Sequence, residues 1–218
     1  MLKSRPEIKA EAKAAMKQQW GTSIGTLVLF FVIVMIGAIF GYIPALFGII
    51  GSLLVSATSI FIDMPLSVGV YGVFTKVYRK EETGAGEIFS VFSNNYLRKV
   101  GGMLWMGLFV FLWTLLLIIP GIVKAFSYAM IPYILADCPN VTARQAMKIS
   151  MRMMKGHKAE LFVLSLSFIG WFLLGMLTFG ILNIVFVGPY YYTSYAGFYA
   201  ELKEHSIKEG VISEEELA

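Results

Sequence analysis

Residues 24–57 read IGTLVLFFVIVMIGAIFGYIPALFGIIGSLLVSA and contain no Lys, Arg, Asp or Glu. A transmembrane helix needs about 20 consecutive apolar residues to cross a hydrocarbon core of ~30 Å. Across all 218 residues, 57% are hydrophobic and only 15% are charged. A soluble domain of this size could not hide so much apolar surface. We therefore expect an all-α integral membrane protein.

Further apolar runs predict six transmembrane helices arranged as three hairpins, each preceded by a short amphipathic helix on the cytoplasmic side. The limits of the first two spans stay open, because span one could continue past Gly48 or span two could bend near Pro65. The spans are expected at residues 22–42, 54–76, 100–119, 121–136, 161–181 and 186–202. They form one domain, residues 1–202, followed by an acidic tail, 203–218, and breaks are expected at 120–121, 137–140 and 183–189.

Three amphipathic segments separate these hairpins. Ser4 and Glu7 have capping-box spacing, and so do Thr142 and Gln145, which marks helix starts. In each segment apolar residues recur along one side, as in helices that lie on a membrane surface. The predicted surface helices are residues 5–19, 84–97 and 141–156.

Positive charge fixes the orientation. Seventeen of the 18 Lys and Arg residues fall on one side of the predicted spans, and only Lys124 falls on the other. Basic residues concentrate in cytoplasmic loops, so both termini are expected in the cytoplasm of a bacterial plasma membrane. The basic pI of about 9.1 then reflects contact with anionic lipid and not with nucleic acid, and membrane lipids are the expected partners. A homo-oligomer or a membrane-protein partner stays open.

Little in the sequence supports catalysis or a cofactor. One cysteine, Cys138, and two histidines supply neither an internal disulfide nor a structural metal site. The sequence has no Gly-x-Ser-x-Gly, His-Glu-x-x-His or phosphate-binding glycine loop. We expect no enzyme, no metal and no cofactor.

Four basic residues draw a stripe along the third surface helix, with Ala146, Met147, Met153 and Met154 expected to supply apolar contact. The stripe suits lipid phosphates, but ordinary positive-inside charge would produce the same pattern. The basic stripe consists of Arg144, Lys148, Arg152 and Lys155.

Asp63 is the only acidic residue within an apolar run. An ionised carboxylate at mid-depth is costly unless it is paired, so Asp63 is a candidate intramembrane polar site with Lys124 as its partner. The alternative places Asp63 at the outer interface.

Each predicted return span contains a proline that frees a backbone carbonyl, which could bind a ligand or simply shape the bundle. These helix breaks are Pro65, Pro132 and Pro189. Two of them begin the same pattern, Pro-x5-Tyr-x2-Phe, at residues 65–74 and 189–198, which indicates a weak internal repeat. Interfacial anchoring is the first interpretation of the nearby aromatics, and an amphiphile site is the second; they are Trp20, Trp171, Tyr190, Tyr191 and Tyr192.

Residues 150–158, SMRMMKGHK, and 166–171, LSFIGW, resemble the signature of an uncharacterised bacterial membrane-protein family, domain-of-unknown-function family 975. Residues 188–190, 198–202 and 8–21 are similar to its other motifs, so the resemblance covers nearly the whole chain. It implies a plasma-membrane protein and no particular activity. More distantly, the chain is similar to the membrane domain that precedes glycerophosphodiester phosphodiesterase in some proteins.

These features favour binding, sensing or movement of a lipid or amphiphile in envelope homeostasis. The alternatives are a small-solute transporter or its substrate-binding membrane subunit, and a membrane adaptor that recruits a partner. The transporter fits less well, because the small-x3-small surface on span one is limited to Gly37 and Gly41.

Overall fold

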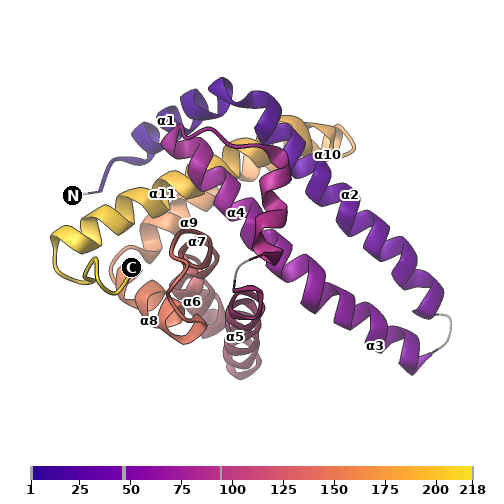
Figure 1. Cartoon of the computed structure of the whole chain (residues 1–218). Helices are drawn as coiled ribbons and strands as arrows, with labels where there is room; N and C mark the ends of the chain where they lie inside the picture. The colour runs from indigo at the N-terminus through magenta and orange to yellow at the C-terminus, as the bar shows by residue number, and fades with distance from the viewer. Residues whose placement is uncertain (1, 46–47, 94, 218) are drawn as a thin grey trace.

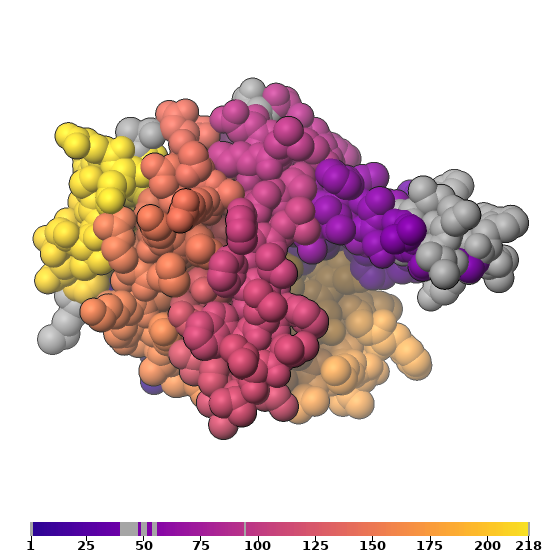
Figure 2. All heavy atoms as spheres, turned by 90° about the horizontal axis from the view of Figure 1, so that it is seen from below, coloured from indigo at the N-terminus to yellow at the C-terminus, as the bar shows by residue number. Residues whose placement is uncertain are grey.

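The computed structural model describes residues 2–45, 48–93 and 95–217, and in those residues it contains helices and turns but no strand. Helix α1 (Arg5–Gln18) leads into α2 (Trp20–Ala45), the longest helix. Helix α3 (Ile49–Thr58) runs back beside α2, and together they form an arm that extends away from the rest of the molecule (Figure 1). Figure 2 shows the same arm in a perpendicular view, far from the C-terminal segment.

The body of the molecule is built on α4 (Met64–Arg79) and α11 (Gly188–Lys208), which pack against each other. Helix α4 also contacts α7 and the 3₁₀-helix η2, and α11 also contacts α1 (Figure 1). Large aromatic side chains from these helices fill the core. The other elements are η2 (Ala85–Phe92), α5 (Tyr96–Leu116), α6 (Ile118–Tyr128), α7 (Ile131–Asp137), α8 (Ala143–Met153), α9 (Lys158–Leu166) and α10 (Ile169–Leu177).

Five helical stretches among the described residues are long and apolar enough to cross a membrane. Exposed apolar side chains cover their outer faces; Ile39 is 57% exposed, Leu115 72% and Leu177 79%. So much exposed apolar surface suits a multi-pass membrane protein, because lipid takes the place of water around it. The five stretches are Trp20–Ile39, Ser56–Arg79, Tyr96–Leu116, Ile118–Asp137 and Lys158–Leu177.

The sixth expected span, residues 186–202, is not among these five. Those residues belong mostly to α11, whose Ser, Thr, Tyr and charged side chains lower its hydropathy. Much of α11 is buried by the other helices, so its surroundings are largely protein. Six spans in three hairpins therefore stay a prediction.

Two breaks lie elsewhere than expected. The turn expected at Pro120-Gly121 occurs at Leu117, where the backbone is extended, and Pro120 lies in the first turn of α6. A proline is tolerated there because the first N–H groups of a helix have no partner in the helix. The turn expected at residues 183–189 occurs at 178–180, and residues 183–187 form a π-helix, η3 (Asn183–Val187).

The limits of the first two spans were left open between two alternatives. Helix α2 ends at Ala45, which does not fit a continuation of span one past Gly48. Helix α3 begins at Ile49, directly after Gly48, which has a positive φ of 72° that favours glycine. Residues 46 and 47 lie outside the described residues. Near Pro65 the helix is irregular, because the π-helix η1 (Ser59–Asp63) precedes α4.

Both capping boxes are present, but the apolar faces that follow them face protein. Ile8, Ala12 and Met16 of α1 are buried against α11 and α4. Ala146, Met153 and Met154 at α8 are also buried, so their apolar contact is with the protein core. A periodicity of 3.6 residues shows that one face is apolar, not which apolar medium covers it. The second segment, expected at residues 84–97, differs in type, because residues 85–92 form a 3₁₀-helix and Tyr96 already belongs to α5.

Candidate functional site

A cavity of about 340 Å³, which we call the tyrosine cavity, lies within the body of the molecule. It is bordered by five helices, namely α4, α6, α7, α9 and α11. Its lining residues are Tyr71, Ala125, Phe126, Ala129, Tyr133, Leu161, Ser165, Tyr191 and Tyr195. Four tyrosines thus surround a space whose remaining wall is mostly apolar.

Helix breaks place two of these tyrosines. The π-helices η1 and η3 end just before Pro65 and Pro189, and in each the next N–H bonds five residues back, from Met64 to Ser59 and from Gly188 to Asn183. A proline ring clashes with the carbonyl four residues earlier, and a wider π-turn relieves this clash. Tyr71 and Tyr195 follow their prolines by six residues and both line the cavity.

The aromatic rings pack closely around the cavity. The ring centroids of Tyr71 and Tyr133 are 4.8 Å apart in an edge arrangement, and those of Tyr191 and Tyr195 are 4.3 Å apart. Tyr133 also stacks on Tyr199 at 5.3 Å. Such contacts hold the rings in fixed orientations, so the cavity wall is largely preorganised.

Only some of the polar side chains around the cavity have hydrogen-bond partners. The Ser165 hydroxyl donates to the Leu161 carbonyl at 2.8 Å, which leaves its oxygen to accept a bond from the Tyr195 hydroxyl. The Tyr133 side chain is 1% exposed, and its hydroxyl has no hydrogen-bond partner among the described residues. An unpaired buried hydroxyl costs about 1–3 kcal/mol, and this one belongs to a residue of the cavity wall.

The rim of the cavity is apolar. Next to the lining residues of α6 and α9, Val123 and Phe162 are each 44% exposed. Phe162 packs edge-on against the lining residue Phe126, with ring centroids 5.7 Å apart. The arrangement suits a ligand with an apolar body and a small polar group.

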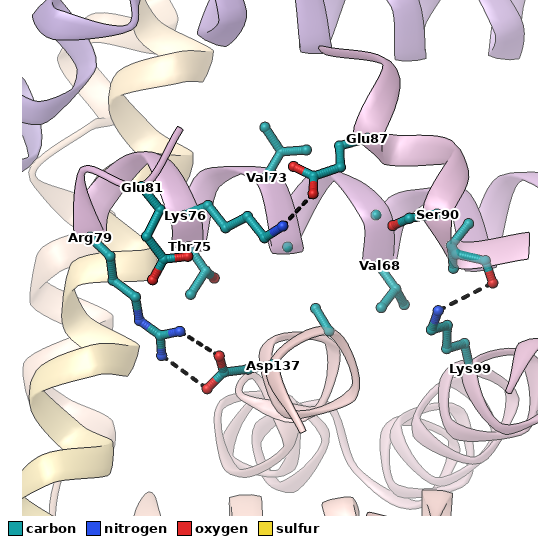
Figure 3. A pocket seen from close by; sticks show the side chains of 14 residues that line it. Val68, Val73, Thr75, Lys76, Arg79, Glu81, Glu87, Ser90, Lys99 and Asp137 are labelled. Carbon is teal, nitrogen blue, oxygen red and sulfur yellow. Dashed lines mark hydrogen bonds and ion pairs between the residues drawn. The ribbon is translucent and has the colours of Figure 1, made fainter. Parts of the chain in front are cut away.

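A second cluster, which sequence reasoning missed, joins three helices through Asp137 at the end of α7. Its carboxylate accepts two bonds from Arg79 of α4, at 2.5 and 2.9 Å, as Figure 3 shows. From α11, Lys203 donates to it at 2.6 Å and the Tyr199 hydroxyl at 3.0 Å. The Asp137 side chain is only 9% exposed. We interpret this cluster as a structural junction of the three helices.

The chain around Asp137 is also fixed from α5. The Arg98 guanidinium donates to the carbonyls of Leu135, Cys138 and Val141 at 2.5–2.7 Å. These carbonyls lie at and just beyond the end of α7, where helix carbonyls lack intrahelical partners. Burial raises the pKa of the Cys138 thiol, so this cysteine is an inert part of the core.

The four residues of the basic stripe are exposed, three of them on α8 and Lys155 in the turn after it, and the C-terminal tail partly covers the stripe. Arg152 donates to both carboxylate oxygens of Glu216 at 2.9 Å. Ile212 and Leu217 of the tail are buried in the core. Arg144, Lys148 and Lys155 remain exposed.

The structure does not bring Asp63 and Lys124 together. Asp63 is half-buried in η1 and hydrogen-bonds to the Ser59 side chain. The Lys124 ammonium lies 4.8 Å above the centroid of the Trp113 ring, a cation–π contact. Among the described residues no ion pair joins the two charges.

The aromatic residues expected at the interface lie largely inside the protein. Tyr190 is 8% exposed, Tyr191 lines the cavity, and Tyr192 stacks on Phe74 at 5.3 Å. Trp20 packs on Phe186, whereas Trp171 is 38% exposed. The second interpretation of the tyrosines, as part of an amphiphile site, thus gains a geometric basis.

The prolines begin new helical segments. Pro65 and Pro189 follow the π-helices, and Pro132 follows the turn between α6 and α7. Tyr133, the residue after Pro132, carries the unpaired hydroxyl. The Pro-x5-Tyr-x2-Phe pattern and the second interpretation of Tyr191 were the sequence signals for this site, and nothing in the sequence marked Ser165.

The model of the family described as protein of unknown function (DUF975) matches residues 1–127 and 114–206. No curated protein matches the chain, and no solved structure matches it either. The more distant resemblance to glycerophosphodiester phosphodiesterases therefore stays an expectation. In the described part of the chain, no group of three or more His, Cys, Asp or Glu side chains could hold a metal ion.

Proposed function

The chain belongs to the DUF975 family of proteins of unknown function, and we propose that it binds a membrane amphiphile in the tyrosine cavity. The observation that supports this proposal is the unpaired, buried hydroxyl of Tyr133, a residue that lines a mostly apolar cavity. Tyrosine suits such a ligand because its ring packs against apolar groups while its hydroxyl bonds a polar one.

We place the protein in the bacterial plasma membrane, with the side of the spans that carries most of the Lys and Arg residues toward the cytoplasm. The distribution of Lys and Arg supports this orientation. Exposed residues of the basic stripe would then attract anionic lipid, each by about 1 kcal/mol. Such attraction enriches anionic lipid near the protein, whereas the cavity selects one amphiphile for sensing or movement in envelope homeostasis.

The test is lipid analysis by native mass spectrometry of protein extracted in a mild detergent. Ala129→Leu narrows the cavity, and Ala159→Leu makes the same change at an exposed position of α9. We expect one class of amphiphile to be enriched above its share of the membrane in wild type and in Ala159→Leu, and depleted in Ala129→Leu. A bulk-like profile in all three would contradict the proposal.

A third variant separates the cavity from the basic stripe. Changing Arg144, Lys148 and Arg152 together to Gln removes three charges of the stripe without altering any cavity residue. The proposal expects the enriched amphiphile to persist in this variant while loosely bound anionic lipid falls. Loss of the amphiphile here, with retention in Ala129→Leu, would assign binding to the stripe.

A further inference from the structure

A different cavity, of about 240 Å³, lies between α4, η2, α5 and α7, at the charged end of the bundle. Figure 3 shows charged side chains from all four elements or their flanking residues around it, among them Lys76, Glu87, Lys99 and Asp137. This charged cavity shares no lining residue with the tyrosine cavity. A ligand here would therefore contact none of the residues that line the tyrosine cavity.

Glycines on α4 give the charged cavity its shape. A Cβ atom on Gly69 would lie 2.3 Å from the carbonyl oxygen of Ile88. One on Gly72 would lie 3.4 Å from the Cβ atom of Ala136. Both η2 and α7 thus approach the backbone of α4, and the space between them is lined by longer polar side chains.

Most charges in the cavity are paired with each other. Lys76 bonds to Glu87, and Arg79 bonds to Asp137. Burial raises the pKa of the Glu87 carboxyl, but hydrogen bonds from Lys76 and Thr83 outweigh this and hold the pKa below its usual value. Glu87 is thus ionised at neutral pH, and its pair with Lys76 is formally neutral.

Lys99 is the exception among the cations that line the cavity. It is 9% exposed, and its ammonium group donates one hydrogen bond, at 3.2 Å, to the Val91 carbonyl. No carboxylate lies within 4.0 Å of it in the described residues. An ammonium has three N–H donors, and burying its charge without a counter-ion is unfavourable. Three cations and three carboxylates, Glu81 among them, line the cavity, so the formal charges balance, and Lys99 supplies the spare donors beside which a ligand could sit.

We propose that the charged cavity binds one phosphate group, with Lys99 as its counter-ion. Lysine binds phosphate as a point charge, and the Lys76 ammonium and Ser90 line the same space as additional donors. The volume of about 240 Å³ leaves room for a phosphate group with a small substituent.

The phosphate could belong to a soluble metabolite or to a lipid headgroup. Phe89 and Phe92 of η2 are 46% and 40% exposed, so the element that borders the cavity also carries side chains suited to a membrane interface. A soluble metabolite and a lipid headgroup present the same phosphate group to Lys99, so the experiment uses one probe of each kind.

The test is isothermal titration calorimetry on delipidated full-length protein in a neutral detergent. The probes are glycerol 3-phosphate, short-chain phosphatidic acid in mixed micelles, and succinate. Lys99→Gln removes the charge but keeps a donor for the Val91 carbonyl. Lys80→Gln removes an equal charge from an exposed residue that does not line the cavity.

We expect Lys99→Gln to weaken phosphate binding by about 10- to 100-fold, whereas Lys80→Gln changes it by less than about twofold. Binding of glycerol 3-phosphate would indicate a soluble ligand, and binding of phosphatidic acid alone a lipid headgroup. If Lys99→Gln does not fold, Ser90→Trp fills the cavity without altering any charge and should abolish binding. No binding of either phosphate probe, equal binding of succinate, or an equal loss in Lys80→Gln would overturn the proposal.

Discussion

The junction at Asp137 allows a quantitative test of what holds the three helices together. Asp137→Asn keeps the size of the side chain but removes the charge that faces Arg79 and Lys203. Breaking a buried pair by removing one partner costs about 3–5 kcal/mol. The Arg79 and Lys203 side chains are 32% and 23% exposed, so water lowers this to about 2–4 kcal/mol.

One opposing effect makes this a stringent test. Asp137 ends α7, and a negative charge at a helix C-terminus is unfavourable by about 0.3–1 kcal/mol, which the variant regains. The matched control is Glu216→Gln, which breaks the Arg152 pair, whose side chains are 43% and 42% exposed. An exposed pair contributes about 0–1 kcal/mol.

The assay is unfolding by a denaturing detergent in mixed micelles, followed by tryptophan fluorescence. Asp137→Asn is expected to lower the free energy of unfolding well below the control, and adding Lys203→Met should cost less in that background than in wild type. If the losses in Asp137→Asn and Glu216→Gln agree within error, or if the double variant is additive, the junction does not stabilise the fold.

Three further predictions concern the tyrosine cavity, the charged cavity and the tail. Tyr133→Phe should keep the fold and raise its stability slightly, because it removes an unpaired buried hydroxyl, and it should reduce retention of the enriched amphiphile. The control in the same mass-spectrometric assay is Tyr128→Phe, because Tyr128 is buried outside the cavity. Gly69→Ala should destabilise the protein by about 1–3 kcal/mol, because the new Cβ meets backbone of η2, whereas Gly86→Ala on η2 has open space and should change thermal unfolding little. Hydrogen bonds from the Arg152 side chain and, to a smaller extent, from the Ser213 backbone lower the pKa of Glu216 in the docked tail. The contribution of Glu216 to docking is therefore fully present above the pKa of the free glutamate, and it is lost as the pH falls through the lowered value. The protection factors of the amides of residues 209–217, which correct for the pH dependence of intrinsic exchange, should therefore fall between pH 7 and about pH 3 in wild type and be low at both in Glu216→Gln; equal protection in the two proteins would contradict this.

Local patterns predicted local structure well in this chain. The charge-free stretch at residues 24–57 indicated a membrane protein, and Thr142 with Gln145 marked the start of α8. The Asp137–Asn140 break is confirmed by the end of α7 at Asp137. Each of these features depends on neighbours within one or two turns, which the sequence contains directly.

Contacts between distant segments could not be predicted in the same way. Arg79 and Asp137 are 58 residues apart, and each alone fits a basic or acidic helix end. Tyr190 and Tyr192 are near a proline and resemble interfacial anchors, but packing against α4 and Phe168 encloses them. Aromatic side chains satisfy a membrane interface and a protein core equally well, so only the arrangement of the helices decides between them.

The two copies of Pro-x5-Tyr-x2-Phe connect the helix breaks to the cavity. In each copy a π-helix precedes the proline, the tyrosine lines the tyrosine cavity, and the phenylalanine, Phe74 or Phe198, is buried in the core. Each proline thus follows a π-helical break and stands at a fixed distance from a ring that lines the cavity and from another that lies in the core. Because the same spacing produces the same placement on α4 and α11, the repeat has a structural consequence beyond chance similarity. A ligand in the tyrosine cavity would contact both helices six residues after their breaks, so the two breaks are the positions through which its binding could be transmitted to the rest of the bundle.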